Sequence, residues 1–247
     1  MQYVFVITYG RSGSTVLMRL LNMIDGWCIR GENMGALNLM ALVSARLRSA
    51  QAESSANSGR VTHPWYGIGD VNPSAVGSAL SSLFEHEFLR PDEDTRVTGF
   101  KEIRFTPDHV SDQDYTDIIH FMAEEFPNSR FIFNTRSWRE VARSGWWRFR
   151  VDLGNVRKCI EAADARFKDS SRELGTRAFC IDYADYKDNP EGFRPLLSWL
   201  GEELSPSQLS AVLETKLKHL AFKEDERGRL LRLRRAFYWR IVDRIVG

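Results

Sequence analysis

The sequence predicts an α/β protein with a P-loop-like fold in three layers, in which a central, mostly parallel sheet is flanked by helices. Short apolar runs alternate along the chain with segments of helical periodicity, an order typical of parallel sheets. The first apolar run, residues 3–7, leads through a loop of small residues straight into an amphipathic segment. The chain has 247 residues, 43% hydrophobic and 27% charged, so we expect a single globular domain over residues 1–247.

Four apolar runs have the length and composition of core strands. The predicted strands are residues 3–7, 97–105, 130–135 and 178–182. Helices are predicted at residues 16–21, 34–47, 73–89, 115–126, 155–174 and 190–200, with a loop and helix over 136–150 and another helix from 205. In the helix over residues 73–89, Leu80, Leu83, Phe84 and Phe88 are expected to form one apolar face.

Residues 49–72 lack a clear period and are rich in Ser, Ala, Asn and Gly. Long irregular segments in compact domains are usually binding loops or disordered. Trp65 and Tyr66 lie within this stretch, and they favour a binding loop that could stack on a sugar or an aryl ring.

The charge balance and the cysteines limit the class of protein. Basic residues number 34 and acidic residues 33, so no overall field attracts nucleic acid, and we expect no nucleic-acid partner. Cys28, Cys159 and Cys180 form neither a CxxC pair nor a metal-ligand pattern, which favours reduced, buried thiols and a cytoplasmic protein. No apolar run approaches the roughly 18 residues of a membrane span.

The loop over residues 10–15 predicts a phosphate or sulfate site. A strand, a small-residue loop and a helix start direct backbone N–H groups and the positive end of a helix dipole at one point. We expect the ligands to be Gly10, Arg11, Ser12, Gly13, Ser14 and Thr15. The loop lacks the G-x-x-x-x-G-K-[ST] pattern of nucleoside-triphosphate loops. An ordinary strand-to-helix turn with a Ser N-cap stays open as the alternative.

A second anion site is predicted after the third strand. Arg136 directly follows residues 130–135, and Ser144 comes eight residues later, within the expected helix. Ligands of parallel sheets bind beyond the carboxyl ends of the strands, so Arg136 and Arg11 should lie on the same edge of the sheet. Two anion sites on one edge indicate a ligand with two separated phosphate groups.

Four stretches between roughly residues 3 and 201 resemble the sulfotransferases that use 3′-phosphoadenosine 5′-phosphosulfate (PAPS). TYGRSGST (8–15) is similar to their 5′-phosphosulfate loop, and NTRSWREVARS (134–144) is similar to their 3′-phosphate site. GFKEIRF (99–105) resembles the lysine-bearing strand of Golgi-type members, and residues 179–201 resemble a late strand-turn-helix element. The loop is closer to carbohydrate, tyrosylprotein and bacterial members than to the cytosolic aryl type.

The resemblance implies an enzyme that moves a sulfuryl group from PAPS to an acceptor hydroxyl, with a sugar hydroxyl favoured and no metal needed. The Gly-Glu step of related enzymes points to Glu32 as the general base, with Lys101 and Arg11 as the cations that stabilise the transferring group. Glu102 is the rival base, or else a structural partner of Lys101 or Arg104. Peptidyl tyrosine, a lipid head group and small phenols or alcohols stay open as acceptors.

Two other functions stay open. One is a P-loop kinase-like phosphotransferase, which predicts a loop lysine and an acidic Mg²⁺ ligand. The other is a non-catalytic nucleotide or anion binder of the same fold, which would not need Glu32 or Lys101. The basic amphipathic segment 226–247 predicts a final helix that packs on the domain or contacts an anionic membrane. Arg227 and Gly228 within it are similar to an element that closes on the 3′-phosphate.

Overall fold

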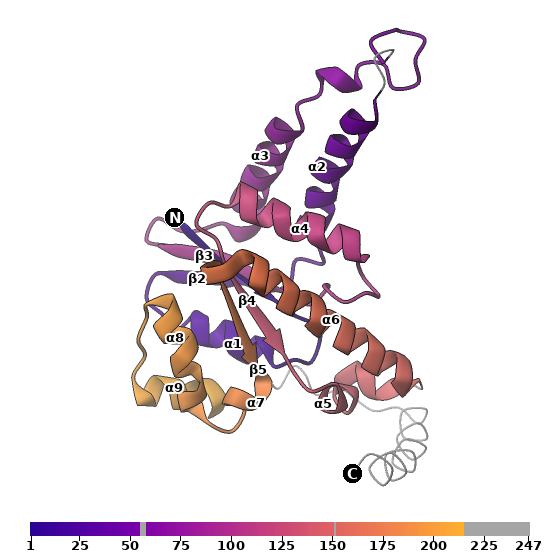
Figure 1. Ribbon diagram of the computed structural model, residues 1–247. Coiled ribbons are helices and arrows are strands. Elements are labelled where there is room, and N and C mark those ends of the chain that lie inside the picture. The colour runs from indigo at the N-terminus through magenta and orange to yellow at the C-terminus, as the bar shows by residue number, and fades with distance from the viewer. Residues whose placement is uncertain (55–57, 151, 215–247) are drawn as a thin grey trace.

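The computed structural model of the protein describes residues 1–54, 58–150 and 152–214. Its centre is a five-stranded sheet in the order β2-β3-β1-β4-β5, in which every pair of neighbouring strands is parallel (Figure 1). The strands are β1 (Gln2–Ile7), β2 (Trp27–Arg30), β3 (Val97–Glu102), β4 (Arg130–Thr135) and β5 (Ala178–Asp182). The predicted α/β fold is confirmed.

Helices cover both faces of the sheet (Figure 1). The α-helices of the described residues are α1 (Ser14–Leu21), α2 (Ala36–Glu53), α3 (Pro73–Phe84), α4 (Asp112–Glu125), α5 (Trp138–Ala142), α6 (Leu153–Leu174), α7 (Tyr183–Tyr186), α8 (Arg194–Leu200) and α9 (Pro206–Glu214). Short turns of 3₁₀-helix form η1 (Ile68–Asp70), η3 (Gly145–Phe149), η4 (Gly175–Arg177) and η5 (Pro190–Phe193), and η2 (Glu85–Leu89) is a π-helix.

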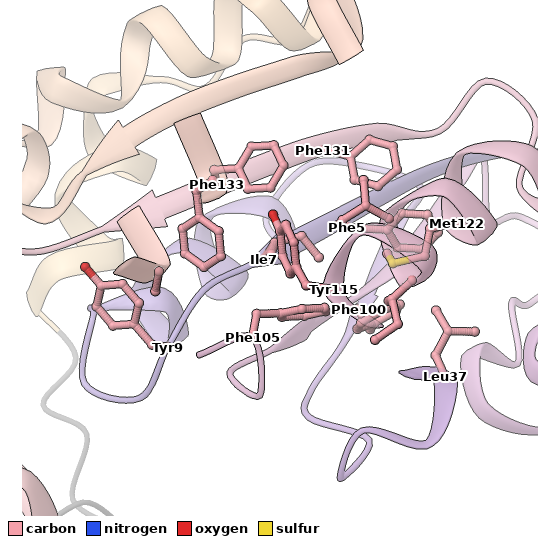
Figure 2. Packing of buried hydrophobic residues seen from close by; sticks show 14 of the residues in the cluster. Phe5, Ile7, Tyr9, Leu37, Phe100, Phe105, Tyr115, Met122, Phe131 and Phe133 are labelled. Carbon is pink, nitrogen blue, oxygen red and sulfur yellow. The ribbon is translucent and has the colours of Figure 1, made fainter. Parts of the chain in front are cut away.

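The two faces of the sheet carry separate cores, because successive side chains of a strand point in opposite directions. From β1, Phe5 and Ile7 join the larger core with α2 to α6, whereas Val4 and Val6 join the smaller core with α1, α8 and α9. Figure 2 shows part of the larger core, where the ring of Phe5 lies 5.1 Å from that of Phe100. Burial on both faces fixes β1, and therefore fixes the loop that leaves its carboxyl end.

The edge strand β2 was not predicted from the sequence. It has four residues, and only Trp27 and Ile29 are buried, which is too short a signal to separate from a loop. The side chain of Asn22 pairs with its outer edge: Nδ2 donates to the Ile29 carbonyl over 2.8 Å, and Oδ1 accepts from the Ile29 N–H over 2.7 Å. The Asn22 amide therefore takes the place of a neighbouring strand at that residue.

Other predicted boundaries also shift. The strand expected over residues 97–105 ends at Glu102, and the helix expected over 34–47 runs on to Glu53. Leu83 and Phe88 are exposed although Phe84 is buried, so the expected apolar face of residues 73–89 is wrong for these two side chains. The helix turns into a π-turn after Phe84, and this change of period rotates Phe88 away from the core, whereas Leu83 lies on the outer side of α3 itself.

The connection between α2 and α3 lies at the far end of both helices from the sheet (Figure 1). Trp65 and Tyr66 belong to this connection, and both are exposed. They line a pocket there with Ala50 and Ile68, well away from the carboxyl edge of the sheet, because α2 alone spans 18 residues, or about 27 Å.

Two remaining expectations concern the cysteines and the end of the chain. All three thiols are free; Cys159 is buried, Cys28 is partly buried and Cys180 is exposed, so the expected burial is wrong for Cys180. The final helix predicted over residues 226–247, with Arg227 and Gly228, lies outside the described residues. No helix within the described ranges combines the length and the apolar character that a membrane crossing requires.

Candidate active site

The loop between β1 and α1 opens the amino end of α1 toward solvent-accessible space. Its N-cap residue is Gly13, with φ at 88°, and no side chain caps the helix. The alternative of a plain Ser-capped turn is therefore wrong: Ser14 is the first residue of the helix. A Cβ atom at residue 13 would lie 2.2 Å from the Tyr183 ring, so glycine is required here both by backbone conformation and by space.

Buried side chains hold the loop from behind. The Thr8 hydroxyl donates to Ser12 Oγ over 2.7 Å, and Asn134 Nδ2 donates to the Ser12 carbonyl over 3.1 Å. Tyr186 in turn donates to Asn134 Oδ1 over 2.9 Å. Ser12 is fully buried, so its hydroxyl shapes the loop and does not face the pocket. Thr8 and Asn134 begin the two motifs TYGRSGST and NTRSWREVARS, but no role in holding the loop was predicted for them or for Tyr186.

The two predicted anion sites form one network. Arg11 Nε donates to Ser144 Oγ over 3.0 Å, and Arg136 Nη1 donates to the Arg11 carbonyl over 2.9 Å. The Arg136 guanidinium lies 4.1 Å from the centre of the Tyr183 ring and 3.4 Å from Glu140 Oε2. Burial, followed by the charge of Arg136, lowers the pKa of the Arg11 guanidinium. Such a concentration of positive charge favours an anion.

Ser144 reaches this network by a route that differs from the prediction. The sequence suggested that it sits two turns into a helix, but α5 ends at Ala142 and Ser144 has an extended backbone immediately before η3. The break turns the chain back over the loop, so Ser144 meets Arg11 although it lies outside a helix.

Tyr9 positions the backbone of Arg136. Its hydroxyl accepts from the Arg136 N–H over 2.8 Å and lies 2.9 Å from both the Arg136 carbonyl and Asp164 Oδ1, to which it can donate. Burial raises the pKa of Asp164 to about 6, against the effect of the Tyr9 hydrogen bond and with a further rise from the charge of Asp182. No role was predicted for Tyr9 or Asp164, because the loop after β1 and helix α6 are remote in sequence.

Glu32 and Lys101 meet at the side of the same pocket. Glu32 follows β2, Lys101 belongs to β3, and Lys101 Nζ lies 2.5 Å from Glu32 Oε1. The Lys101 side chain is 5% exposed and that of Glu32 is 35% exposed. A buried ammonium whose partner carboxylate is open to solvent can face a ligand that enters from that side.

The pocket encloses about 250 Å³ at the carboxyl edge of the sheet. Of the ten site residues predicted from the sequence, all but Ser12 and Ser144 line it, and Val16, Ile103, Trp146 and Tyr183 complete its wall. Gly10 packs under the Trp146 ring, where a Cβ atom would lie 2.2 Å from Cζ2. The structure therefore brings the predicted loop, Arg136, Glu32 and Lys101 to one cavity.

Glu102 lies outside this pocket and is fully buried. Its carboxylate accepts from the backbone N–H groups of Asn33 at 3.1 Å, Gly35 at 2.9 Å and Ile103 at 2.8 Å, and from Arg104 Nη1 at 2.8 Å. These donors tie the segment that carries Glu32 to the end of β3. Arg104 Nη1 also lies 3.6 Å from Glu32 Oε2.

The described residues contain no group of three or more His, Cys, Asp or Glu side chains that could hold a metal ion. The site consists instead of cations, hydroxyls and uncapped backbone N–H groups, with the Glu32 carboxylate on its wall and Glu140 beside Arg136.

The parallel sheet, the glycine-capped loop and the cationic pocket define an α/β protein that binds phosphate or sulfate groups at a helix amino end. The sequence profile of the sulfotransferase family matches residues 3–206, and the chain belongs to this family. It is therefore an enzyme of sulfuryl transfer. No curated protein sequence matches the chain significantly.

The solved structures that share the fold include two sulfotransferase domains. The sulfotransferase domain from the olefin synthase of Synechococcus PCC 7002 is 16% identical, with a TM-score of 0.50, and the match covers 90% of this chain and 83% of that one. The sulfotransferase domain from the curacin biosynthetic pathway is 13% identical, with a TM-score of 0.51, over 86% of this chain and 78% of that one. At these identities the likeness establishes the fold alone.

Proposed function

We propose that this enzyme transfers the sulfuryl group of PAPS to an acceptor hydroxyl, and that the acceptor is a carbohydrate. The observation that carries the proposal is the Lys101–Glu32 pair, which lines the same pocket as the anion-binding loop and Arg136. One pocket thus offers partners for the two phosphate groups of the donor, a cation for the transferring group and a base for the acceptor. The sugar rests on the resemblance of the loop to carbohydrate sulfotransferases.

The phosphosulfate end of the donor would bind at the loop. The uncapped N–H groups at the start of α1 and the hydroxyls of Ser14 and Thr15 can hold its oxygens, and the helix dipole favours their charge. Arg136, Ser144 and Arg11 would hold the 3′-phosphate, because Arg11 hydrogen-bonds to Ser144 and charge-assisted bonds to phosphate are strong. Arg11 thereby joins the two ends of the nucleotide.

The transfer follows the logic of phosphoryl transfer, in which positioning and charge stabilisation dominate. The acceptor oxygen attacks sulfur in line, while its proton passes to the Glu32 carboxylate. The bond between sulfur and the bridging phosphate oxygen breaks, and adenosine 3′,5′-bisphosphate leaves with the bonding electrons. Lys101 can donate to Glu32 and to an oxygen of the donor together, because an ammonium group has three N–H donors.

Glu32 suits the base role better than Glu102. Its side chain is 35% exposed and it lines the pocket, whereas Glu102 has no exposed surface and already accepts from four donors. A base must reach the proton that it removes. We therefore propose Glu102 as the structural partner that holds the Glu32 segment.

The competing functions lack comparable support. A kinase-like reaction would use a lysine just before Ser14, and the chain has Gly13 there. A passive binder would have no use for a half-exposed carboxylate beside a buried ammonium.

Calorimetry without metal tests the proposal, with adenosine 3′,5′-bisphosphate compared with AMP, ADP and ATP. We expect micromolar binding of the bisphosphate and much weaker binding of AMP. Sulfuryl transfer from PAPS to a panel of oligosaccharides, phenols, alcohols and tyrosine peptides then identifies the acceptor, and turnover restricted to non-sugars would overturn the carbohydrate assignment. Mg²⁺-dependent transfer from ATP would overturn the sulfotransferase mechanism itself.

A further inference from the structure

The turn η3 is wrapped onto the anion-binding loop through three consecutive residues. Gly145, with φ at 52°, packs against the Arg11 side chain, since a Cβ atom there would lie 2.7 Å from Arg11 Cδ and Nε. The Trp146 ring covers Gly10, and Trp147 Nε1 donates to the Gly10 carbonyl over 3.1 Å. The first three residues of this turn therefore pack against the anion-binding loop, and Trp146 lines the pocket.

Arg148 follows these three residues directly in the same turn, and its charge acts on the Arg11 guanidinium. Its side chain is half-buried, its guanidinium carbon lies 4.8 Å from the centre of the Phe149 ring, and its Nε is buried without a hydrogen-bond partner.

Arg148 differs from Arg136 and Arg150 in its charge partners. Arg136 lies 3.4 Å from Glu140, and Arg150 lies 3.1 Å from Asp108. Among the residues that the structure describes, no carboxylate forms an ion pair with Arg148. Burial lowers the pKa of Arg11, and the charges of Arg136 and then of Arg148 lower it further. A half-buried cation beside like charges is unfavourable unless an anion binds there.

We propose that Arg148 is a third guanidinium of the nucleotide site and binds the 3′-phosphate together with Arg11 and Arg136. The inference rests on the proposed function, and it adds a residue that neither the loop motif nor the strand-end motif contains. A 3′-phosphate carries up to two negative charges, so a third cation would sharpen the preference for a 3′-phosphorylated nucleotide over one without that group.

Calorimetry of Arg148→Ala in the full chain tests the proposal, with adenosine 3′,5′-bisphosphate and AMP as the two ligands. We expect the dissociation constant of the bisphosphate to rise about tenfold to a hundredfold, while that of AMP changes less than about threefold. Arg148→Lys should recover part of the loss, because it restores the charge without the planar fork. Arg150→Ala is the matched control, since Arg150 is exposed and paired with Asp108, and it should bind both ligands as the wild type does.

The melting temperature without ligand separates binding from a structural role. Arg148→Ala removes a charge that Arg11 repels, so the melting temperature without ligand should stay unchanged or rise. A lower melting temperature with equal losses for both ligands would overturn the proposal, and so would unchanged binding of the bisphosphate. If Arg148→Ala does not fold, Arg148→Gln, which keeps much of the stem, replaces it in the same comparison. A wild type that does not prefer the bisphosphate over AMP would instead overturn the proposed function.

Discussion

Lys101 Nζ lies 2.5 Å from Glu32 Oε1, and this contact joins the centre of the sheet to the segment that follows its edge strand. Lys101 is almost fully buried in β3, next to β1, whereas Glu32 is partly open to solvent. The pair therefore joins a buried strand beside the anion-binding loop to a solvent-accessible carboxylate of the same pocket.

Glu32→Gln should lose turnover by roughly several hundredfold, because general-base assistance typically contributes about 10²–10⁴-fold. The amide keeps the shape of the carboxylate and can still accept from Lys101, so nucleotide binding should stay within about threefold of the wild type. Steady-state kinetics together with calorimetry check both parts. Normal turnover of this variant would remove Glu32 from the base role.

Glu102→Gln should act on stability rather than on the chemistry. Its carboxylate accepts four hydrogen bonds in a fully buried position, so we expect the free energy of unfolding to fall by about 1–3 kcal/mol. Urea unfolding measures this change. A variant with full stability and a loss of turnover larger than that of Glu32→Gln would reverse the two assignments.

Arg136→Ala and Arg11→Ala should each weaken binding of adenosine 3′,5′-bisphosphate by about tenfold or more, because each removes a charge-assisted contact to phosphate. Calorimetry measures the change. Arg172→Ala is a suitable control, since Arg172 forms an exposed pair with Asp169 on α6. Equal affinity of wild type and both variants would show that the cationic network does not bind the nucleotide.

Asp164 should make the protein less stable as pH rises through mildly acid values. Its pKa is about 6 in the folded protein and 3.8 as the ordinary value, so the folded state holds the proton more tightly than the unfolded chain. Stability is therefore lost between about pH 4 and 6. Asp164→Asn removes this loss and should raise the free energy of unfolding at pH 7.5 by about 1–2 kcal/mol, allowing for partial exposure. The gain should vanish near pH 4, and a gain that is the same at both pH values would contradict the assignment.

Gly13→Ala should lower both the melting temperature and the nucleotide affinity. The new Cβ atom would meet the Tyr183 ring at 2.2 Å, and the backbone there has φ at 88°, a conformation that alanine adopts at a cost of about 1–2 kcal/mol. Thermal unfolding and calorimetry report the two effects. Gly69→Ala is the control, because nothing lies within 4 Å of a Cβ atom at that position, and a similar loss there would point to a general effect of the substitution.

The strands that were predicted correctly stand out in the sequence as short apolar runs between helical segments. Residues 130–135 and 178–182 match β4 and β5, and the loop after β1 was identified from its glycines and hydroxyls. The four residues of β2 were not identified, since its apolar run has only three residues before Arg30 and the strand depends on pairing with β3. Local periodicity detects a strand only where the strand itself is long enough to show it.

Some residues of the candidate site could be predicted from local sequence patterns, and others could not. Arg11, Arg136, Glu32 and Lys101 stand in recognisable local patterns, and the structure brings them to one pocket. Tyr9 and its contacts to Arg136 and Asp164 join residues 127 and 155 positions apart in the chain. No local pattern predicts such pairs, because the fold alone makes them neighbours.

The amide of Asn22 has a consequence for self-association. An uncovered edge strand offers free N–H and C=O groups to any other extended chain, which is a common start of aggregation. Asn22 occupies both groups of Ile29 at the outer edge of β2, so another chain cannot pair there without displacing it. A side chain from the turn before the strand thus hinders the addition of another strand at this edge of the sheet, three residues before Glu32.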